Sequence, residues 1–366
     1  MKVLITGATG LIGSELGKAL AMRGDQITAF VRDPERVKAT LPFPARLIRW
    51  TTEEEMSAEA RKALLSAEAI VHLAGEPVAD GRWTDERKKR IRDSRVNGTS
   101  ALVSVLQPNL KSADRALKVF VHGSAIGIYG NREDEILDHQ SAPGTGFLAS
   151  VVSEWEAAIS ELEAAENLRT VTVRTGVVLS RQGGALKKML PIFRNGLGAR
   201  LGFAGAQWMS WIHIDDMVRL LLHAVDSSKV SGVIEAVAPQ PVRNKDFTTS
   251  FCENLDVIQG PPVPEFALKL LYGEMADVLL DSQRVVPTAT KASGFEFQFQ
   301  DVGLALADIL APLRGQTHEL LAEQWVPTSA ENIFPYFSDE KNLEELTPPL
   351  LSFRVIGKST DKIQEG

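Results

Sequence analysis

Short apolar runs alternate with helical patterns along most of the chain, and this alternation is the first indication of its fold. Seven runs have the length and composition of strands: residues 1–6, 25–31, 46–50, 67–75, 116–122, 169–174 and 232–237. Residues 14–23, 57–65 and 83–106 lie between the earlier runs and have the pattern of helices. Unbroken apolar strands separated by helices are typical of a parallel sheet buried on both faces. The sequence therefore predicts an α/β fold with a doubly wound parallel sheet.

The first strand runs directly into three glycines, Gly7, Gly10 and Gly13, and a helix follows them. Strand, glycine turn and helix in this order open the dinucleotide-binding βαβ unit. There the glycines let the backbone approach a pyrophosphate, and the helix N-terminus attracts it. Glycines that merely end a strand are the alternative interpretation. We predict that the cofactor binds at the ends of two strands, namely at Gly7, Thr9, Gly10, Leu11, Ile12 and Gly13 and at Leu73, Ala74, Gly75 and Glu76.

The end of the second strand indicates which cofactor is bound. Arg32 stands where this fold recognises the 2′-position of the ribose, and an arginine there accommodates the 2′-phosphate of NADP. Asp33 complicates the prediction, since it either serves the ribose hydroxyl of NAD or caps the next helix in front of Pro34. We predict NADP, with NAD as the less favoured alternative. A solvated surface charge is the remaining interpretation of Arg32.

The overall composition narrows the class of protein. Of the 366 residues, 44% are hydrophobic and 24% are charged, and the net charge is −7 at pH 7. An acidic chain of this kind argues against nucleic acid or an anionic membrane as a partner. No apolar run is long enough to span a bilayer, and the N-terminal run has the length of a strand rather than of a signal peptide. One cysteine, Cys252, cannot form a disulfide within the chain, which predicts a cytoplasmic protein. The histidines and carboxylates show no metal-ligand spacing, so no metal site is predicted.

Several longer phrases carry a family resemblance. They are His72-Leu-Ala-Gly75, Ser124 with Tyr129-Gly130, and Trp211-Ile-His-Ile-Asp-Asp216. Together with the glycine turn, they resemble the extended short-chain dehydrogenases of the NAD-dependent epimerase/dehydratase group. Within that group the chain resembles the YfcH-like branch of epimerase family proteins, through Gly75-Glu-Pro, Arg82-Trp83-Thr, Asp93–Gly98, Arg181–Leu186 and Gln207–His213. The resemblance covers roughly residues 1–312 and implies a Rossmann core with a small substrate lobe that binds NAD(P).

The resemblance also indicates which catalytic groups to expect. In the wider superfamily, a serine and a Tyr-x-x-x-Lys motif carry out the proton chemistry, and the lysine lowers the pKa of the tyrosine. Here Phe147 stands at the tyrosine position and Val151 at the lysine position. The predicted catalytic residues are therefore Ser124, as a hydrogen-bond donor to a substrate carbonyl, and Tyr129. Two hypotheses follow: an NADP(H)-dependent oxidoreductase or epimerase-like enzyme, and a cofactor-binding sensor or scaffold without turnover.

Other residues near the predicted strand ends have competing interpretations. His72 and His213 are interpreted as packed residues rather than catalysts. Arg174 is either a structural cation or a group that reaches the cofactor or substrate at the sheet edge. The side chains of Trp208, Met209 and Trp211 are expected to form an apolar, aromatic wall of the substrate pocket.

The chain is predicted to consist of three segments. Residues 1–238 form the NAD(P)-binding domain, and residues 239–314 form a small C-terminal lobe on the substrate side. Within the lobe, residues 295–300 alternate with period two, which predicts a half-buried strand. Residues 318–366 resemble the opening of a START-like polyketide-cyclase domain, an α+β fold that encloses an apolar ligand. The predicted substrate is a small molecule that the sequence does not identify, and a homodimer and a fused START-like domain are left open as partners.

Overall fold

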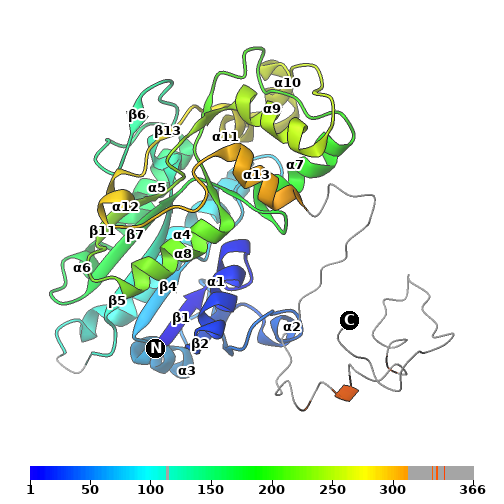
Figure 1. Ribbon diagram of the computed structural model, residues 1–366. Helices are drawn as coiled ribbons and strands as arrows, with labels where there is room; N and C mark the ends of the chain where they lie inside the picture. Colours follow the sequence, from blue (N-terminus) through cyan, green and yellow to red (C-terminus); the bar gives the residue numbers. More distant parts are fainter. Residues whose placement is uncertain (113–114, 312–331, 333–334, 337–341, 343–366) are drawn as a thin grey trace. The chain divides into compact units, whose positions relative to one another are not determined.

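The computed structural model describes residues 1–112, 115–311, 332, 335–336 and 342 (Figure 1). The chain divides into a unit of residues Met1–Glu323 and a second unit of Gln324–Gly366. The predicted START-like segment, residues 318–366, falls almost entirely outside the described residues and stays a prediction. All the helices and strands named below belong to the first unit.

A seven-stranded sheet forms the centre of the first unit. Its strands, in spatial order, are β11 (Gly232–Ala236), β7 (Arg169–Thr175), β5 (Val119–Ala125), β4 (Ala69–His72), β1 (Lys2–Thr6), β2 (Gln26–Val31) and β3 (Arg46–Arg49). Every neighbouring pair in this sheet is parallel. The direction of the strand order reverses at β1, and such a switch point is where doubly wound sheets bind ligands. The predicted fold class is confirmed.

Helices cover both faces of the sheet (Figure 1). They are α1 (Leu11–Met22), α2 (Pro34–Lys38), α3 (Ala58–Ser66), α4 (Asp85–Leu106), α5 (Phe147–Ala157), α6 (Ser160–Glu163) and α8 (Ile214–Asp226). Val3 and Ile5 of β1 share a hydrophobic core with α1 and α8, whereas Leu4 shares one with α3 and α4. Successive side chains of a strand point to opposite faces, so a strand covered on both faces has to be apolar throughout.

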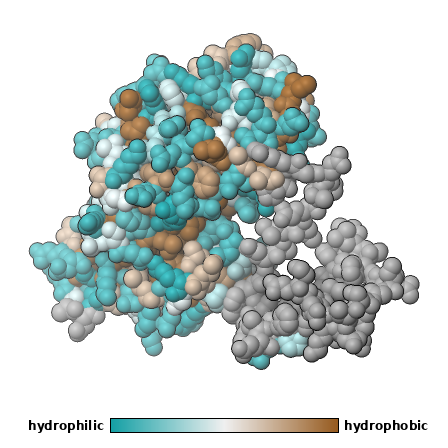
Figure 2. Space-filling view, in the orientation of Figure 1, coloured by the Kyte–Doolittle hydropathy of each residue, from teal (hydrophilic) through white to brown (hydrophobic). Residues whose placement is uncertain are grey.

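Six further helices form a lobe in the upper part of Figure 1. They are α7 (Gly184–Arg194), α9 (Asn244–Leu255), α10 (Glu265–Tyr272), η3 (Gly273–Ala276), α11 (Asp277–Leu280) and α13 (Val302–Leu310). Phe193, Phe251 and Leu306 belong to its core. The surface seen in Figure 2 is mainly hydrophilic, with apolar side chains in small separate areas. No helix in the described ranges is both long and apolar enough to cross a lipid bilayer.

Short elements connect the lobe to the sheet. They are the 3₁₀ helix η2 (Ile126–Tyr129), the helix α12 (Thr288–Ala292), and the strand pairs β8 (Val177–Leu179) with β10 (Trp211–His213), β9 (Trp208–Met209) with β12 (Val242–Arg243), and β6 (Ile136–Leu137) with β13 (Arg284–Val285). The β9–β12 pair is antiparallel and the other two are parallel. These pairs fix the loops that leave the carboxyl end of the central sheet.

The prediction of a strand at residues 295–300 is wrong. Phe295 and Phe297 are buried, as the period-two pattern indicates, but the segment pairs with no strand in the part of the chain that the structure describes. Instead, the amides of Gln298 and Phe299 donate to the carboxylate of Asp216 at 2.9 and 2.8 Å. A buried carboxylate thus satisfies backbone groups that a neighbouring strand would otherwise pair.

Candidate functional site

The turn between β1 and α1 requires glycine at two positions. Gly7 has a φ of +74°, and a Cβ atom there would lie 2.8 Å from the carbonyl carbon of Leu73. A Cβ atom at Gly13 would lie 2.2 Å from the carbonyl oxygen of Gly7. Helix α1 begins after Gly10 without a side-chain cap and without an acidic residue in its first turn. Its first amides are therefore open to an anion, which the helix dipole also favours.

The loop after β4 lies against this turn. The hydroxyl oxygen of Thr6, at the end of β1, accepts hydrogen bonds from the amides of Leu73 and Ala74 at 3.2 and 3.1 Å. Further along the loop, the carbonyl of Glu76 accepts a hydrogen bond from Arg95 of α4 at 3.0 Å. The two predicted cofactor-binding segments thus meet at one edge of the sheet, and their role in binding stays a prediction.

Arg32 follows β2 at the same edge, and its side chain is exposed. Within the described part of the chain, it has no hydrogen-bond or ion-pair partner. Asp33, in contrast, caps α2, because its carboxylate accepts a hydrogen bond from the amide of Arg36 at 3.2 Å. Asp33 therefore has the capping role that was one of its two interpretations, and Arg32 is available to a group on the ribose 2′-oxygen.

The carboxyl ends of β5 and β7 carry a largely buried hydrogen-bond network. Its centre is Glu156 of α5, whose carboxylate accepts hydrogen bonds from the Ser124 hydroxyl at 2.5 Å and from the Arg174 guanidinium at 2.8 and 2.9 Å. Arg174 also donates to the Tyr129 hydroxyl at 2.9 Å. All three guanidinium nitrogens of Arg174 are engaged by protein acceptors, which favours the structural interpretation of this residue.

Tyr129 is completely buried, and its hydroxyl group is satisfied by the protein. The hydroxyl donates to the carbonyl of Asp138 at 2.7 Å and accepts from Arg174. Burial raises the pKa of Tyr129 to about 12, although the charge of Arg174 opposes the shift. Such a weakly acidic phenol is a poor proton donor and acceptor near neutral pH. This geometry favours packing over catalysis for Tyr129, and the catalytic roles of Tyr129 and Ser124 stay predictions.

Sequence reasoning did not identify Glu156 or the surroundings of Phe147. Phe147, at the tyrosine position, contacts Trp83 edge to face with ring centroids 4.9 Å apart. The ammonium of Lys88 lies 5.4 Å from the centroid of the Phe147 ring. Glu156 is one of two carboxylates on α5, and the sequence has no signal that separates it from Glu154. Phe147, Trp83 and Lys88 thus form an aromatic and cationic cluster at the position that corresponds to the superfamily's tyrosine.

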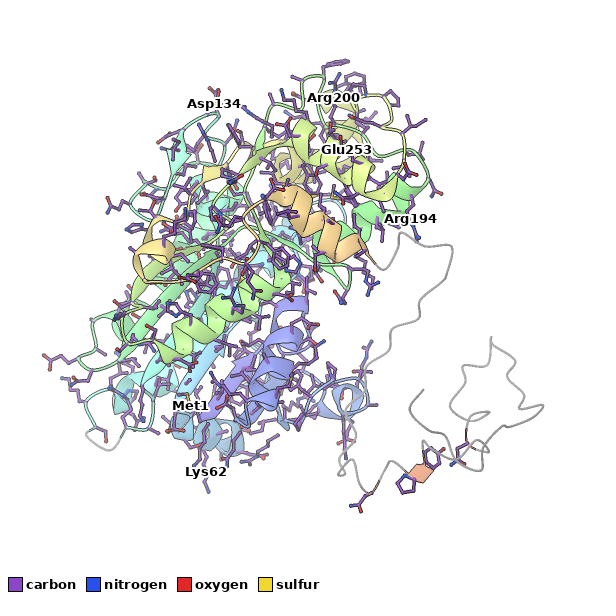
Figure 3. All side chains as sticks on the ribbon, in the orientation of Figure 1. Met1, Lys62, Asp134, Arg194, Arg200 and Glu253 are labelled. Atoms are coloured by element: carbon purple, nitrogen blue, oxygen red, sulfur yellow. The ribbon has the colours of Figure 1, made fainter. Side chains whose placement is uncertain are left out.

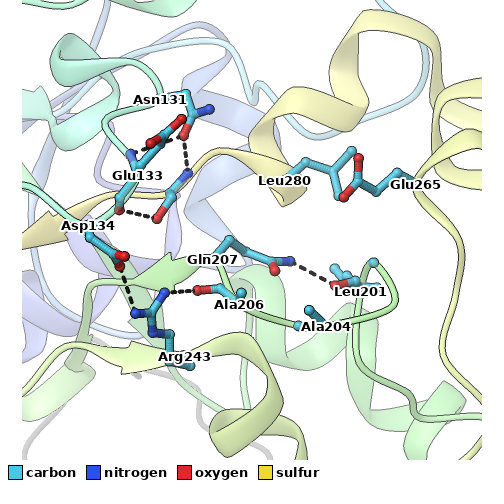
Figure 4. Close-up of a pocket in the computed structure, with 13 residues that line it drawn as sticks. Asn131, Glu133, Asp134, Leu201, Ala204, Ala206, Gln207, Arg243, Glu265 and Leu280 are labelled. Carbon is cyan, nitrogen blue, oxygen red and sulfur yellow. Dashed lines mark hydrogen bonds and ion pairs between the residues drawn. The ribbon is translucent and has the colours of Figure 1, made fainter.

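A cavity of about 280 Å³ opens between the loop after η2, the loop before β9 and the lobe (Figure 4). It is lined by Asn131, Glu133, Asp134, Leu201, Gly202, Ala204, Gly205, Ala206, Gln207, Arg243, Glu265, Leu280 and Ser282. Asp134 lies at the opposite end of the unit from Met1, where β1 begins (Figure 3). The cavity is therefore on the carboxyl side of the parallel sheet, where ligands bind in this fold.

The polar groups of this cavity are unevenly engaged. Arg243, the one cationic residue among the described residues of its lining, pairs with Asp134 at 2.7 Å and donates to the carbonyl of Ala206. The carboxylates of Glu133 and Glu265 have no partner in the described part of the chain. The groups left for a ligand are therefore mainly hydrogen-bond acceptors with negative charge.

The two tryptophans predicted to line the substrate pocket are differently placed. The ring of Trp208 lies between two guanidinium groups, 4.2 Å from that of Arg243 and 4.4 Å from that of Arg284. Because Arg243 lines the cavity, Trp208 lies directly behind this part of the cavity wall. Trp211 is fully buried and belongs to the hydrophobic core of the lobe. The expectation that Trp211 forms part of a pocket wall is wrong.

One group of potential metal ligands occurs among the described residues, formed by His213, Asp215 and Asp308. The Nδ1 atom of His213 accepts a hydrogen bond from the Asp215 amide at 3.1 Å, which assigns the ring proton of a neutral His213 to Nε2. The protonated Nε2 faces Asp308 at 3.3 Å. His213 therefore caps α8 and contacts α13, in agreement with its interpretation as a packed residue.

The sheet with its switch point, the glycine turn and the uncapped helix define a Rossmann-type α/β domain. The chain belongs to the NAD dependent epimerase/dehydratase family, whose profile matches residues 3–236. The family resemblance seen in the sequence is thereby confirmed. A domain of unknown function, DUF1731, matches residues 263–309.

Individual relatives are similar over most of this chain. The "Epimerase family protein SDR39U1 homolog, chloroplastic" of Arabidopsis thaliana is 40% identical over 314 residues, 85% of this chain and 87% of that protein. The structure of human epimerase family protein SDR39U1 with NADPH has a TM-score of 0.74 and 32% identity, covering 85% of this chain and 99% of that one. A nucleoside-diphosphate sugar epimerase from Corynebacterium glutamicum has a TM-score of 0.66 and 33% identity, covering 85% of this chain and 58% of that one.

Proposed function

We propose that this chain binds NADP(H) and uses it in an oxidoreductase or epimerase-type reaction on a small substrate. The observation that carries the proposal is the unengaged Arg32 beside the glycine turn, with Asp33 occupied as a helix cap. The NADPH in the structure of the human relative supports the choice of cofactor. NAD is the alternative cofactor, and the predicted cytoplasmic location and homodimer stay predictions.

The residues of this chain fit such a cofactor. The turn from Gly7 to Gly13 and the first amides of α1 would hold the pyrophosphate, and Arg32 would pair with the 2′-phosphate. The loop at Leu73 and Ala74 would close the other side of the turn. When bound, the nicotinamide supplies or accepts a hydride.

Titration of the two cofactors tests this proposal. A guanidinium–phosphate pair contributes about 1.5–3 kcal/mol, so NADPH should bind about tenfold or more tightly than NADH. Arg32→Ala should abolish the preference, whereas Arg36→Ala, which alters an exposed arginine of the following helix α2, should retain it. Equal affinities of the wild-type protein for both cofactors, or a preference that survives in Arg32→Ala, would sink the assignment.

The second candidate function is a sensor or scaffold that binds NADP(H) without turnover. Phe147 and Val151 replace the proton-transfer pair, and the hydroxyl of Tyr129 is fully engaged, which favours this candidate. Transfer of label from stereospecifically labelled NADPH to a panel of small carbonyl compounds separates the two candidates. Transfer to any of them supports the enzyme, and a complete lack of transfer in a protein that binds NADPH supports the sensor.

We further propose that the cavity near Arg243 takes the substrate. Its free carboxylates, Glu133 and Glu265, suit a ligand that is rich in hydrogen-bond donors and is neutral or cationic. A nucleoside diphosphate would bring negative charge to a lining whose cation is already paired. The proposed substrate is therefore not a nucleotide sugar.

A further inference from the structure

His72 is fully buried in β4, yet both of its ring nitrogens have hydrogen-bond partners. Its Nδ1 atom lies 2.6 Å from the hydroxyl oxygen of Thr6, at the end of β1. Its Nε2 atom lies 3.0 Å from the hydroxyl oxygen of Thr99, on α4. The ring therefore links the strand that enters the glycine turn to a helix on the flank of the sheet.

The partners of Thr6 decide where the protons lie. A hydroxyl oxygen has two acceptor lone pairs and one proton. The Thr6 hydroxyl oxygen accepts from the amide of Ala74 and from that of Leu73, which it shares with the Thr6 carbonyl, so its proton points to Nδ1 of His72. The ring proton of a neutral His72 is then on Nε2 and is donated to Thr99.

Two further observations are compatible with this assignment. The hydroxyl oxygen of Thr99 also accepts a hydrogen bond from the indole of Trp155, on α5, at 2.9 Å. Burial lowers the pKa of His72 to about 4, so the ring is neutral at physiological pH.

The neighbouring His122 shows that burial alone does not produce these links. It is the register partner of His72 on β5, and the two rings stack with centroids 5.9 Å apart. It is also fully buried, but neither of its ring nitrogens has a hydrogen-bond partner in the described part of the chain. Of these two adjacent histidines, His72 alone is connected to the loops of the predicted cofactor site.

We propose that neutral His72, protonated on Nε2, is a positioning residue for the cofactor. It fixes the rotation of the Thr6 hydroxyl, and Thr6 in turn holds the amides of Leu73 and Ala74 against the glycine turn. The carbonyl carbon of Leu73 is so near Gly7 that even a Cβ atom has no room between them. The Leu73 amide is also held by the Thr6 carbonyl, so the part of this close spacing that depends on His72 is the contact of the Thr6 hydroxyl with Ala74. The inference rests on the proposed binding of NADP(H).

Matched variants of the two histidines test the proposal. His72→Leu should bind NADPH about tenfold more weakly, the effect of one lost hydrogen bond. His72→Asn, whose side-chain oxygen can reach the position of Nδ1, should stay within about threefold of the wild type. His122→Leu, which alters an equally buried ring, should leave the affinity unchanged. Each affinity is measured by titration calorimetry, after circular dichroism has shown that the variant is folded.

A cofactor fragment separates positioning from general damage. 2′,5′-ADP carries the 2′-phosphate but lacks the pyrophosphate and nicotinamide, so its affinity should be the same in all four proteins. Wild-type affinity for NADPH in folded His72→Leu overturns the inference. So does an equal loss in His122→Leu, or an equal loss for 2′,5′-ADP. A wild-type protein that fails to bind NADPH refutes the proposed function instead, which the first titration shows separately.

The tautomer of His72 provides a test that needs no variant. Long-range proton–nitrogen spectra of the ¹⁵N-labelled wild-type protein report which ring nitrogen carries the proton. A protonated Nε2 and a bare Nδ1 support the proposal. A proton on Nδ1 would make Thr6 the acceptor and displace one of its two amide donors, which overturns the inference even if His72→Leu does not fold.

Discussion

At the scale of single residues, the polar side chains at the strand ends are mostly engaged by the protein itself. The carboxylate of Glu156 holds the hydroxyl proton of Ser124 and the guanidinium of Arg174, and Arg174 donates to Tyr129. Buried polar groups are costly unless they are hydrogen-bonded, so a strand end that carries several of them will pair them with one another. Residue type and position in the sequence therefore indicated polar chemistry here without separating catalysis from structure.

The hydroxyl of Tyr129 is expected to contribute to stability rather than to cofactor binding. Tyr129→Phe leaves Arg174 and the carbonyl of Asp138 each without a partner that they have now. We expect the free energy of unfolding to fall by about 1–3 kcal/mol at pH 7, with unchanged affinity for NADPH. Urea denaturation and cofactor titration measure the two effects, and a loss of NADPH affinity without a loss of stability would contradict the structural role.

The same residue predicts a pH dependence. The pKa of Tyr129 in the folded protein is about 12, against about 10 for an unfolded tyrosine. Between these values the unfolded chain releases the phenol proton while the folded protein retains it, so the stability contributed by neutral Tyr129 is lost as the pH rises. The stability difference between the wild type and Tyr129→Phe should therefore shrink from pH 10 to pH 12. A difference that stays constant over this range would show that the phenol is not buried.

Ser124 has a separate expected outcome. Its proton is held by Glu156, so donation to a substrate requires that this hydrogen bond be broken. If labelled-hydride transfer reveals turnover, Ser124→Ala should lower its rate by about 10²–10³, the range for one lost hydrogen-bond donor to a reacting carbonyl oxygen. Ser150→Ala, which alters an exposed hydroxyl on α5, is the matched control. Full activity in Ser124→Ala would exclude a catalytic role.

At the scale of elements, the sequence predicted the regular parts of the fold and failed where side chains take over from the backbone. The apolar runs located the seven strands because burial on both faces demands such runs. Residues 295–300 show the opposite case, since their alternating burial was correct but their amides bind Asp216 rather than a strand. The Glu156–Arg174 pair was missed for the same reason: it joins a helix to a strand, and periodicity does not report contacts between elements.

The ion pair of Glu156 and Arg174 is expected to anchor α5 to β7. The two side chains are only 15% and 8% exposed, and Glu156→Ala would leave the guanidinium buried without its carboxylate. We expect this variant to lose about 3–5 kcal/mol of stability in urea denaturation. Glu154, also on α5, forms an exposed pair with Arg92 of α4, and Glu154→Ala should cost less than about 1 kcal/mol. Similar losses in the two variants would contradict the anchoring role.

At the scale of the whole first unit, the cofactor and substrate sites differ in the charge that they favour. The glycine turn offers amide donors and the dipole of α1, both suited to phosphate groups. The cavity beyond η2 offers unpaired carboxylates. The two sites share the carboxyl side of one sheet. The sequence predicted a substrate pocket with an apolar, aromatic wall but not this carboxylate-rich lining. The lining comes from five separate stretches of the chain, whose approach only the tertiary structure defines.

This difference in charge predicts how the protein treats nucleotide sugars. UDP-glucose carries two phosphate charges, and the lining of the cavity has Glu133, Asp134 and Glu265 against Arg243 alone. We therefore expect 1 mM UDP-glucose to leave the Tm of the NADPH-saturated protein unchanged. Binding with a free energy of about 5 kT or weaker is not detectable at this concentration. Replacing Glu133 and Glu265 together by glutamine removes two opposing charges at nearly constant shape, so any residual affinity for UDP-glucose should rise in that variant. Lys62→Gln, at the opposite end of the unit (Figure 3), is the control for an unspecific effect of charge. Micromolar binding of UDP-glucose to the wild-type protein would show that the cavity accepts a nucleotide sugar and would refute the proposed substrate class.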